Sequence, residues 1–183
     1  MRQFLILAFL CLFAAPAGAK TFEGVTMPDS VQVNGKSLVL NGMGLRKKFV
    51  VKVYVAGFYL PAKETDAAKI LGADTEREMN LQFVYEVEKE KMCKAWNDGL
   101  KNNSPDKADA LKGQFEKLCS YMAVMGEGDK LTFTYVPGQG TTVSVNGTAK
   151  GTIPGKEFAD AMFSCWIGPN PPGADLKQGL LGG

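Results

Sequence analysis

The feature that most constrains the fold of this chain is the way it interleaves β-hairpin signals with helical periodicity. Asn-Gly at 34–35 and Pro-Gly-Gln-Gly at 137–140 each separate two short runs rich in apolar residues, which is typical of antiparallel hairpins. Apolar residues recur at helical spacing over 92–100, 108–122 and 158–166. Because hairpins rather than βαβ crossovers join the strands, we predict an α+β fold with helices on one face of an antiparallel sheet.

The segment 50–60 carries the strongest strand signal. Its odd positions are all apolar, so one face of this strand is predicted to pack in the interior. Its even positions include Lys52 and Tyr54, so the other face is only partly apolar, as expected where a sheet faces a cleft or solvent. We also expect a second long strand at 78–87 and a short final helix at 175–181.

Residues 1–19 are typical of a secretory signal peptide. Arg2 supplies the positive start, 4–15 is apolar, and Ala-Gly-Ala at 17–19 matches a cleavage site. We therefore expect one domain at 20–183, exported to a bacterial periplasm or secreted. No later segment approaches the length of apolar sequence that a membrane helix needs.

The composition excludes several functional classes. The chain contains no histidine, which removes Ser-His and Cys-His catalysis and the commonest metal ligand. The formal net charge is +2, and Arg2 of the predicted signal peptide supplies one of these charges. The near-neutral remainder gives no reason to expect a nucleic-acid partner, and we expect neither a metal nor a cofactor.

Cys93, Cys119 and Cys165 remain after the predicted cleavage, and an oxidising compartment favours a disulfide between two of them. If the helices at 92–100 and 108–122 form an antiparallel hairpin, Cys93 and Cys119 come near the distance that a disulfide tolerates. We place this pairing first. Pairings with Cys165, and three buried reduced thiols, remain open alternatives.

Two segments more than a hundred residues apart carry a family signal. The first is Gly-Met-Gly-Leu-Arg at 42–46, which leads into the strand at 50–60, and the second is Ile-Gly at 167–168 followed by Asp-Leu-Lys at 175–177. Together they resemble the chalcone isomerase-like family. The resemblance implies an open-faced sandwich, in which a layer of helices covers one face of a large curved antiparallel sheet. It also implies a turn at 42–46, before the central strand.

The family contains both enzymes and non-catalytic ligand binders, so individual residues must decide between them. In the plant enzymes that the resemblance invokes, the arginine of the turn holds and polarises the substrate, and Arg46 matches it. The position of the catalytic threonine falls at Tyr54, and Cys165 replaces a hydroxyl residue before the Ile-Gly turn. A Tyr and Asn pair would fall near Glu88 and Ala95, neither of which can take that role.

Because most of the hydrogen-bonding set of the enzymes is missing, we expect non-catalytic binding of a small hydrophobic or amphipathic carboxylate, such as a fatty acid. Arg46 is the predicted anchor, with Tyr54 and Cys165 beside the ligand. One alternative is an isomerase or intramolecular lyase with another substrate, using Tyr54, Lys52 or Glu88 for acid and base work. A second is an envelope structural or assembly factor.

Arg46 also has a competing structural interpretation, in which it pairs with a carboxylate such as Glu88 and only holds the turn. We expect the protein to be a monomer.

Overall fold

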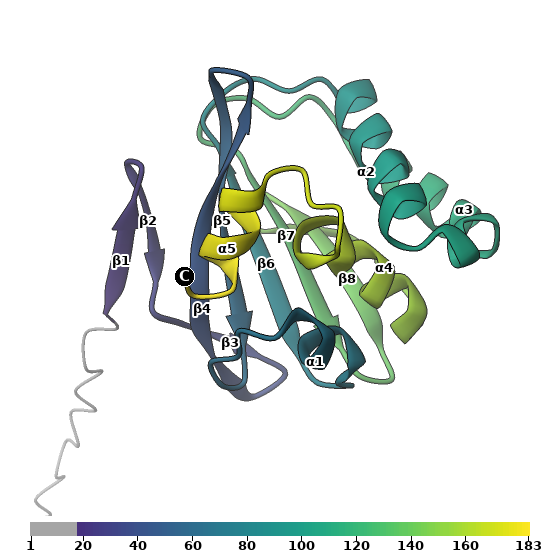
Figure 1. Cartoon of the computed structure of the whole chain (residues 1–183), viewed down its shortest axis with the longest axis horizontal. Helices are drawn as coiled ribbons and strands as arrows, with labels where there is room; N and C mark the ends of the chain where they lie inside the picture. Colours follow the sequence, from purple (N-terminus) through teal and green to yellow (C-terminus); the bar gives the residue numbers. More distant parts are fainter. Residues whose placement is uncertain (1–17) are drawn as a thin grey trace, which may run out of the picture.

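The computed structural model describes residues 18–183. The predicted signal peptide at 1–19 lies outside the described residues except for its last two positions. The described chain forms a curved seven-stranded antiparallel sheet, a separate two-stranded hairpin and five α-helices (Figure 1). Spatial order follows chain order throughout the large sheet, so each strand pairs with its neighbours in the chain, although helical segments at 61–76 and 84–129 separate some of these neighbours. The predicted α+β class is confirmed.

The strands of the sheet are β3 (Ser30–Val33), β4 (Lys36–Lys48), β5 (Val51–Leu60), β6 (Arg77–Phe83), β7 (Lys130–Val136), β8 (Gly140–Val145) and β9 (Thr148–Ile153). The separate hairpin consists of β1 (Ala19–Phe22) and β2 (Val25–Pro28). The helices are α1 (Ala67–Gly72), α2 (Lys89–Asn103), α3 (Ala108–Ser120), α4 (Lys156–Ile167) and α5 (Ala174–Leu180), with a 3-10 turn at Pro105–Lys107. The predicted hairpins and long helices are present. The strand expected at 78–87 is shorter, because β6 ends at Phe83.

The last six residues of β5 are buried because both faces of the sheet are covered there. On the helical side, Phe58 packs with Phe163 of α4, and the core continues through Phe133 of β7. On the opposite side, Met27 of β2 belongs to a second apolar cluster, and the Tyr59 hydroxyl donates a 3.0 Å hydrogen bond to the Pro28 carbonyl. The β1–β2 hairpin therefore covers the side of β5 that carries its buried odd-numbered residues. The sequence predicted that this side packs in the interior.

The Gly-x-Gly segment was predicted to be a turn, and this prediction is wrong, because Gly42 and Gly44 lie inside β4. A Cβ atom on Gly44 would come within 2.5 Å of the Leu176 carbonyl oxygen in α5, and one on Gly42 would collide with the Gly179 carbonyl. The two glycines are needed because α5 lies directly on the strand (Figure 1). They act by close packing rather than by turn geometry.

A buried asparagine joins this contact to the rest of the sheet. Asn41 is 2% exposed and occupies an irregularity in the pairing of β4 with β5. Its Nδ2 donates to the carbonyls of Leu180 (2.8 Å) and Glu64 (2.9 Å), and its Oδ1 accepts from the Glu64 backbone N–H. One side chain therefore ties β4 to the end of α5 and to the loop after β5.

A buried arginine lies between the sheet and α4. Arg77 of β6 is 1% exposed, and its Nη2 donates to Asp160 of α4 at 2.5 Å. Its guanidinium carbon lies 4.9 Å from the ring centres of both Tyr135 and Phe163. The ion pair and the two rings together fix α4 against the sheet.

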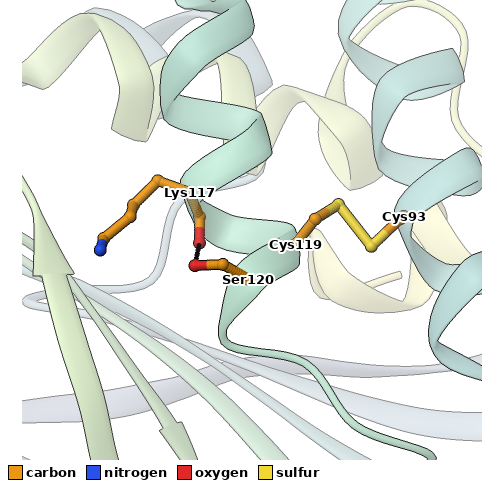
Figure 2. The surroundings of a disulfide bond; sticks show 4 residues. All are labelled: Cys93, Lys117, Cys119 and Ser120. Carbon is orange, nitrogen blue, oxygen red and sulfur yellow. Dashed lines mark hydrogen bonds between the residues drawn. A yellow bond between two sulfur atoms is a disulfide. The ribbon is translucent and has the colours of Figure 1, made fainter.

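A disulfide joins the helical hairpin. Cys93 of α2 and Cys119 of α3 are bonded, with Cα atoms 5.5 Å apart (Figure 2). This is the pairing that the sequence analysis placed first. Cys165 is a buried free thiol, so the helices that carry the disulfide are held together independently of α4.

Candidate functional site

A cavity of about 590 Å³ opens between one end of the sheet and the helices α2 and α4. This volume lies in the range that suits a small organic ligand. Strands β5, β6 and β7 form one wall, and α2 with the C-terminal end of α4 forms the other. Its apolar lining includes Val53, Leu81, Phe83, Met92, Trp96 and Leu131. Tyr54, from the partly apolar face predicted for β5, borders this cavity, and Val51 and Val53 from the other predicted face border it as well, because the strand pairing is irregular there.

Arg46 stands at the mouth because of the close packing of α5 on β4. Gly42, Gly44 and Arg46 alternate along the strand, so they point to the same face. The chain from α5 back to Pro172 runs along that face, since Gly42 and Gly44 contact α5 and Arg46 contacts the loop before it. Arg46 is therefore the first residue of this face whose side chain extends past α5, and it lines the cavity.

The Arg46 guanidinium is held by carbonyl groups. Its Nη1 donates to the Pro172 carbonyl at 2.5 Å and also to the Lys47 carbonyl. Within residues 18–183, no carboxylate forms an ion pair with it. Glu88 pairs instead with Lys91 at 3.0 Å. The interpretation that Arg46 pairs with an acid such as Glu88 is therefore wrong, and its positive charge is not neutralised within the described part of the chain.

Tyr54 lies directly opposite Arg46 in the pairing of β4 with β5. Its hydroxyl oxygen accepts a 2.9 Å hydrogen bond from Nε1 of Trp166, whereas its own proton meets no acceptor among residues 18–183. Burial raises the pKa of Tyr54 to about 12, against the smaller opposing effects of Trp166 and Arg46. The phenol therefore stays protonated near neutral pH, where it is a hydrogen-bond donor rather than a base.

Cys165 of α4 also lines the cavity. Its Sγ donates to the Ala161 carbonyl at 3.4 Å, and burial raises the pKa of the thiol to about 12. A Cβ atom on Gly99 would lie 2.7 Å from this sulfur, so α2 and α4 approach each other closely here. Cys165 acts as a small wall residue. A thiol with this pKa is not an effective nucleophile near neutral pH.

Lys52 and Glu88, named above as possible acid and base groups, do not line the cavity. A register shift in the β4–β5 pairing leaves Arg46 opposite Tyr54 but Lys47 opposite Lys52. This bulge turns Lys52 away from Tyr54, and Lys52 pairs with Glu23 at 2.6 Å. Of the three acid and base groups suggested for an isomerase, only Tyr54 therefore lines the cavity.

These features can be compared with known proteins. A family model described as chalcone isomerase-like matches residues 19–182. The chain belongs to the chalcone isomerase-like family. This confirms the resemblance drawn from the sequence.

Among solved structures, the chain is similar to a fatty-acid binding protein from Arabidopsis thaliana, with a TM-score of 0.71 and 18% sequence identity over 90% of this chain and 96% of that one. At this identity the likeness shows the shared fold. A search of curated proteins found no match.

In this chalcone isomerase-like chain, several site residues could not be singled out from the sequence. Trp166 enters the sequence analysis only as the end of the apolar helical run at 158–166, although its indole N–H donates to the Tyr54 hydroxyl. The loop at 168–173 carries no signal of its own in the sequence, although its Pro172 carbonyl accepts a hydrogen bond from Arg46. Asn103 fixes this loop by accepting from the Asn170 N–H at 2.7 Å and donating to its carbonyl at 3.1 Å. Helical spacing predicted the faces of these elements but not which polar atoms meet.

Proposed function

We propose that this protein binds a fatty-acid-like carboxylate in the cavity without transforming it. The carboxylate lies at the mouth against Arg46, and the hydrocarbon tail lies between Phe83 and Trp96. The observation that carries the proposal is a guanidinium without a carboxylate partner in the described chain, at the edge of an apolar cavity of about 590 Å³. The name of the Arabidopsis structure, a fatty-acid binding protein, supports the same ligand class.

The hydrogen bonds at the mouth support this orientation of the ligand. The two carbonyl contacts of Arg46 both use Nη1, which leaves Nη2 and Nε to donate to an incoming carboxylate. The Tyr54 hydroxyl has a proton to donate and lies opposite Arg46. Each buried methylene of the tail then contributes about 0.8 kcal/mol. The cavity therefore offers donors at its mouth and apolar surface inside.

The protonation states support binding rather than catalysis. Tyr54 and Cys165 both have pKa values raised to about 12, so neither is an effective base or nucleophile near neutral pH. Lys52 and Glu88 lie outside the cavity lining. Arg46 supplies charge recognition without proton transfer, because an arginine guanidinium does not act as a proton donor or acceptor in proteins.

We place this function outside the cytoplasm, in a bacterial periplasm or in the secreted fraction. The signal-peptide pattern at 1–19 supports export. The disulfide between Cys93 and Cys119 fits an oxidising compartment. No helix in the described chain is long and apolar enough to cross a membrane. Mass spectrometry of the exported protein tests the placement, since we expect an N-terminus at Lys20.

The ligand proposal is tested by titrating delipidated protein with palmitate and with hexadecanol. We expect palmitate to bind and Arg46→Gln to weaken it about tenfold to a hundredfold, because a hydrogen bond to a charged group contributes about 1.5–3 kcal/mol. Hexadecanol binding is expected to change little. The matched control is Lys47→Gln, which removes the neighbouring charge without touching the cavity lining.

Equal palmitate affinity in Arg46→Gln and Lys47→Gln would remove Arg46 as the anchor. Failure of the native protein to bind either compound would overturn the ligand class. Turnover of a chalcone panel would overturn the non-catalytic assignment.

A further inference from the structure

The turn between β4 and β5 presents the most exposed apolar side chains among those described. Phe49 is 92% exposed and Val50 is 93% exposed, and Val51 beside them is 38% exposed. Tyr85, in the loop after β6, is 56% exposed. Phe49, Val51 and Tyr85 also line the cavity. The apolar tip therefore continues into the mouth of the cavity rather than standing apart from it.

The charged side chains of the tip segment itself are all positive. Arg46, Lys47, Lys48 and Lys52 fall within residues 46–52, a segment that contains no acidic residue. Lys52 pairs with Glu23, whereas Lys47 and Lys48 form no ion pair within residues 18–183. Apolar side chains surrounded by lysines match an anionic lipid surface, in which the apolar groups enter the interface and the ammonium groups meet lipid phosphates.

The backbone of the turn supports a role for the aromatic ring. Phe49 has a φ angle of 57°, a left-handed conformation that glycine and asparagine adopt at lower cost than a bulky residue. The other non-glycine residues with positive φ in the described chain are Glu23, Asn34 and Asn146, all polar residues at hairpin turns, so Phe49 is the one apolar side chain in this conformation. Phe49 gains no compensating burial within the chain, since its ring is almost fully exposed. An unfavourable backbone conformation that is not offset by contacts inside the protein indicates that the residue serves a function other than folding.

We propose that the β4–β5 tip, residues 47–52, docks on membranes that carry anionic lipids. Phe49 and Val50 insert at the interface, and Lys47 and Lys48 contact the headgroups. This orientation brings the mouth of the cavity, with Arg46, to the lipid surface. The docking itself requires no ligand. Its purpose, exchange of a fatty-acid-like molecule between membrane and cavity, rests on the proposed function.

The test is co-sedimentation of delipidated protein with vesicles of equal parts phosphatidylglycerol and phosphatidylcholine, compared with vesicles of pure phosphatidylcholine. We expect binding to the anionic vesicles, weaker binding to the neutral ones, and loss of binding at high salt. The double variant Phe49→Asn and Val50→Ser is expected to weaken binding about tenfold or more. Asparagine suits the positive φ angle, so this variant keeps the turn.

Two further variants sharpen the test. Val124→Ser is the matched control, because Val124 is 53% exposed and does not line the cavity, and its vesicle binding is expected to equal that of the native protein. Lys47→Gln with Lys48→Gln is expected to reduce binding to anionic vesicles only. Circular dichroism melting curves verify that all variants fold.

Several results would overturn the proposal. The native protein could fail to sediment with anionic vesicles, or it could bind neutral vesicles as well as anionic ones. The double variant at Phe49 and Val50 could bind as well as the native protein, or Val124→Ser could lose as much binding as the double variant. Self-association that the double variant abolishes, without any vesicle binding, would assign the tip to a second copy of the chain. Because the vesicles are tested without palmitate, a failure of fatty-acid binding leaves this result unchanged.

Discussion

Replacing Gly44 by alanine should weaken the fold, and the same replacement at Gly113 should strengthen it. A Cβ atom on Gly44 would lie 2.5 Å from the Leu176 carbonyl oxygen and 2.8 Å from the Leu176 Cδ1. The backbone oxygen cannot rotate away as a side chain would, so α5 must shift. A Cβ atom on Gly113 meets nothing within 4 Å, and Gly113 lies inside α3.

The magnitudes follow from these two environments. Overpacking costs about 1–3 kcal/mol, and the lower entropy of the unfolded alanine chain returns about 0.4–1 kcal/mol. Gly44→Ala should therefore lose about 1–2 kcal/mol of unfolding free energy. Gly113→Ala should gain about 0.5–1 kcal/mol, because glycine in a helix interior is unfavourable relative to alanine. The two changes are chemically identical, so their opposite signs isolate the contact with α5.

The assay is urea unfolding of the oxidised protein, followed by circular dichroism and analysed by linear extrapolation. In a thermal melt, each kcal/mol corresponds to a shift of about 2–4 °C for a domain of this size. If Gly44→Ala were as stable as the native protein, the argument that the packing of α5 requires a residue without a side chain at position 44 would be refuted. A loss of stability in Gly113→Ala equal to that in Gly44→Ala would show that the assay does not distinguish the two environments.

Three further predictions concern other parts of the fold. Replacing Cys93 and Cys119 by serine should cost about 3 kcal/mol of unfolding free energy, since the disulfide closes a loop with a sequence separation of 26 residues. Denaturant unfolding of the oxidised native protein and of the variant measures this difference, and equal stability of the two would contradict the prediction. Asn41→Ala should cost about 1–3 kcal/mol in the same experiment, because it leaves a buried carbonyl and N–H without their partner, and a neutral result would deny the asparagine this role. The unfolding free energy should fall as pH rises from about 10 to about 12. In the unfolded state Tyr54 loses its proton near its ordinary pKa of about 10, whereas in the folded state it keeps the proton up to a pKa of about 12. An unfolding free energy that does not change with pH in this window would contradict the burial argument.

The elements of this fold that local patterns specify could be predicted from the sequence. The hairpin at 34–35 follows from backbone preferences of Asn-Gly, and α4 follows from apolar residues at helical spacing. The turn expected at 42–46 failed for a physical reason. The family resemblance implied that turn, but Gly42 and Gly44 are instead required by a helix more than a hundred residues later in the chain. No local preference contains that contact.

The same distinction applies to the candidate site. The family resemblance singled out Arg46, Tyr54 and Cys165, and all three line the cavity. Lys52 was paired with Tyr54 by simple alternation along the strand, and the bulge in β5 reverses its direction. Trp166 could not be singled out because nothing in its helical spacing reveals a hydrogen bond to a strand residue. Tertiary contacts decide the direction in which a side chain points after a β-bulge. They also decide which group a polar atom meets as its hydrogen-bond partner.

The packing of α5 on β4 also orders events during folding. The strands β3 to β9 pair with neighbours in chain order, so most strand pairs join segments close in the chain, and the β6–β7 pair spans the helical segment 84–129. The contact of Gly44 with Leu176 closes a very long loop, and such closures are slow. Until the final helix docks, the glycine-lined surface of β4 remains bare, and Arg46 lacks the carbonyl of Pro172. Recognition of a ligand at this mouth is therefore among the last properties that the newly made protein acquires.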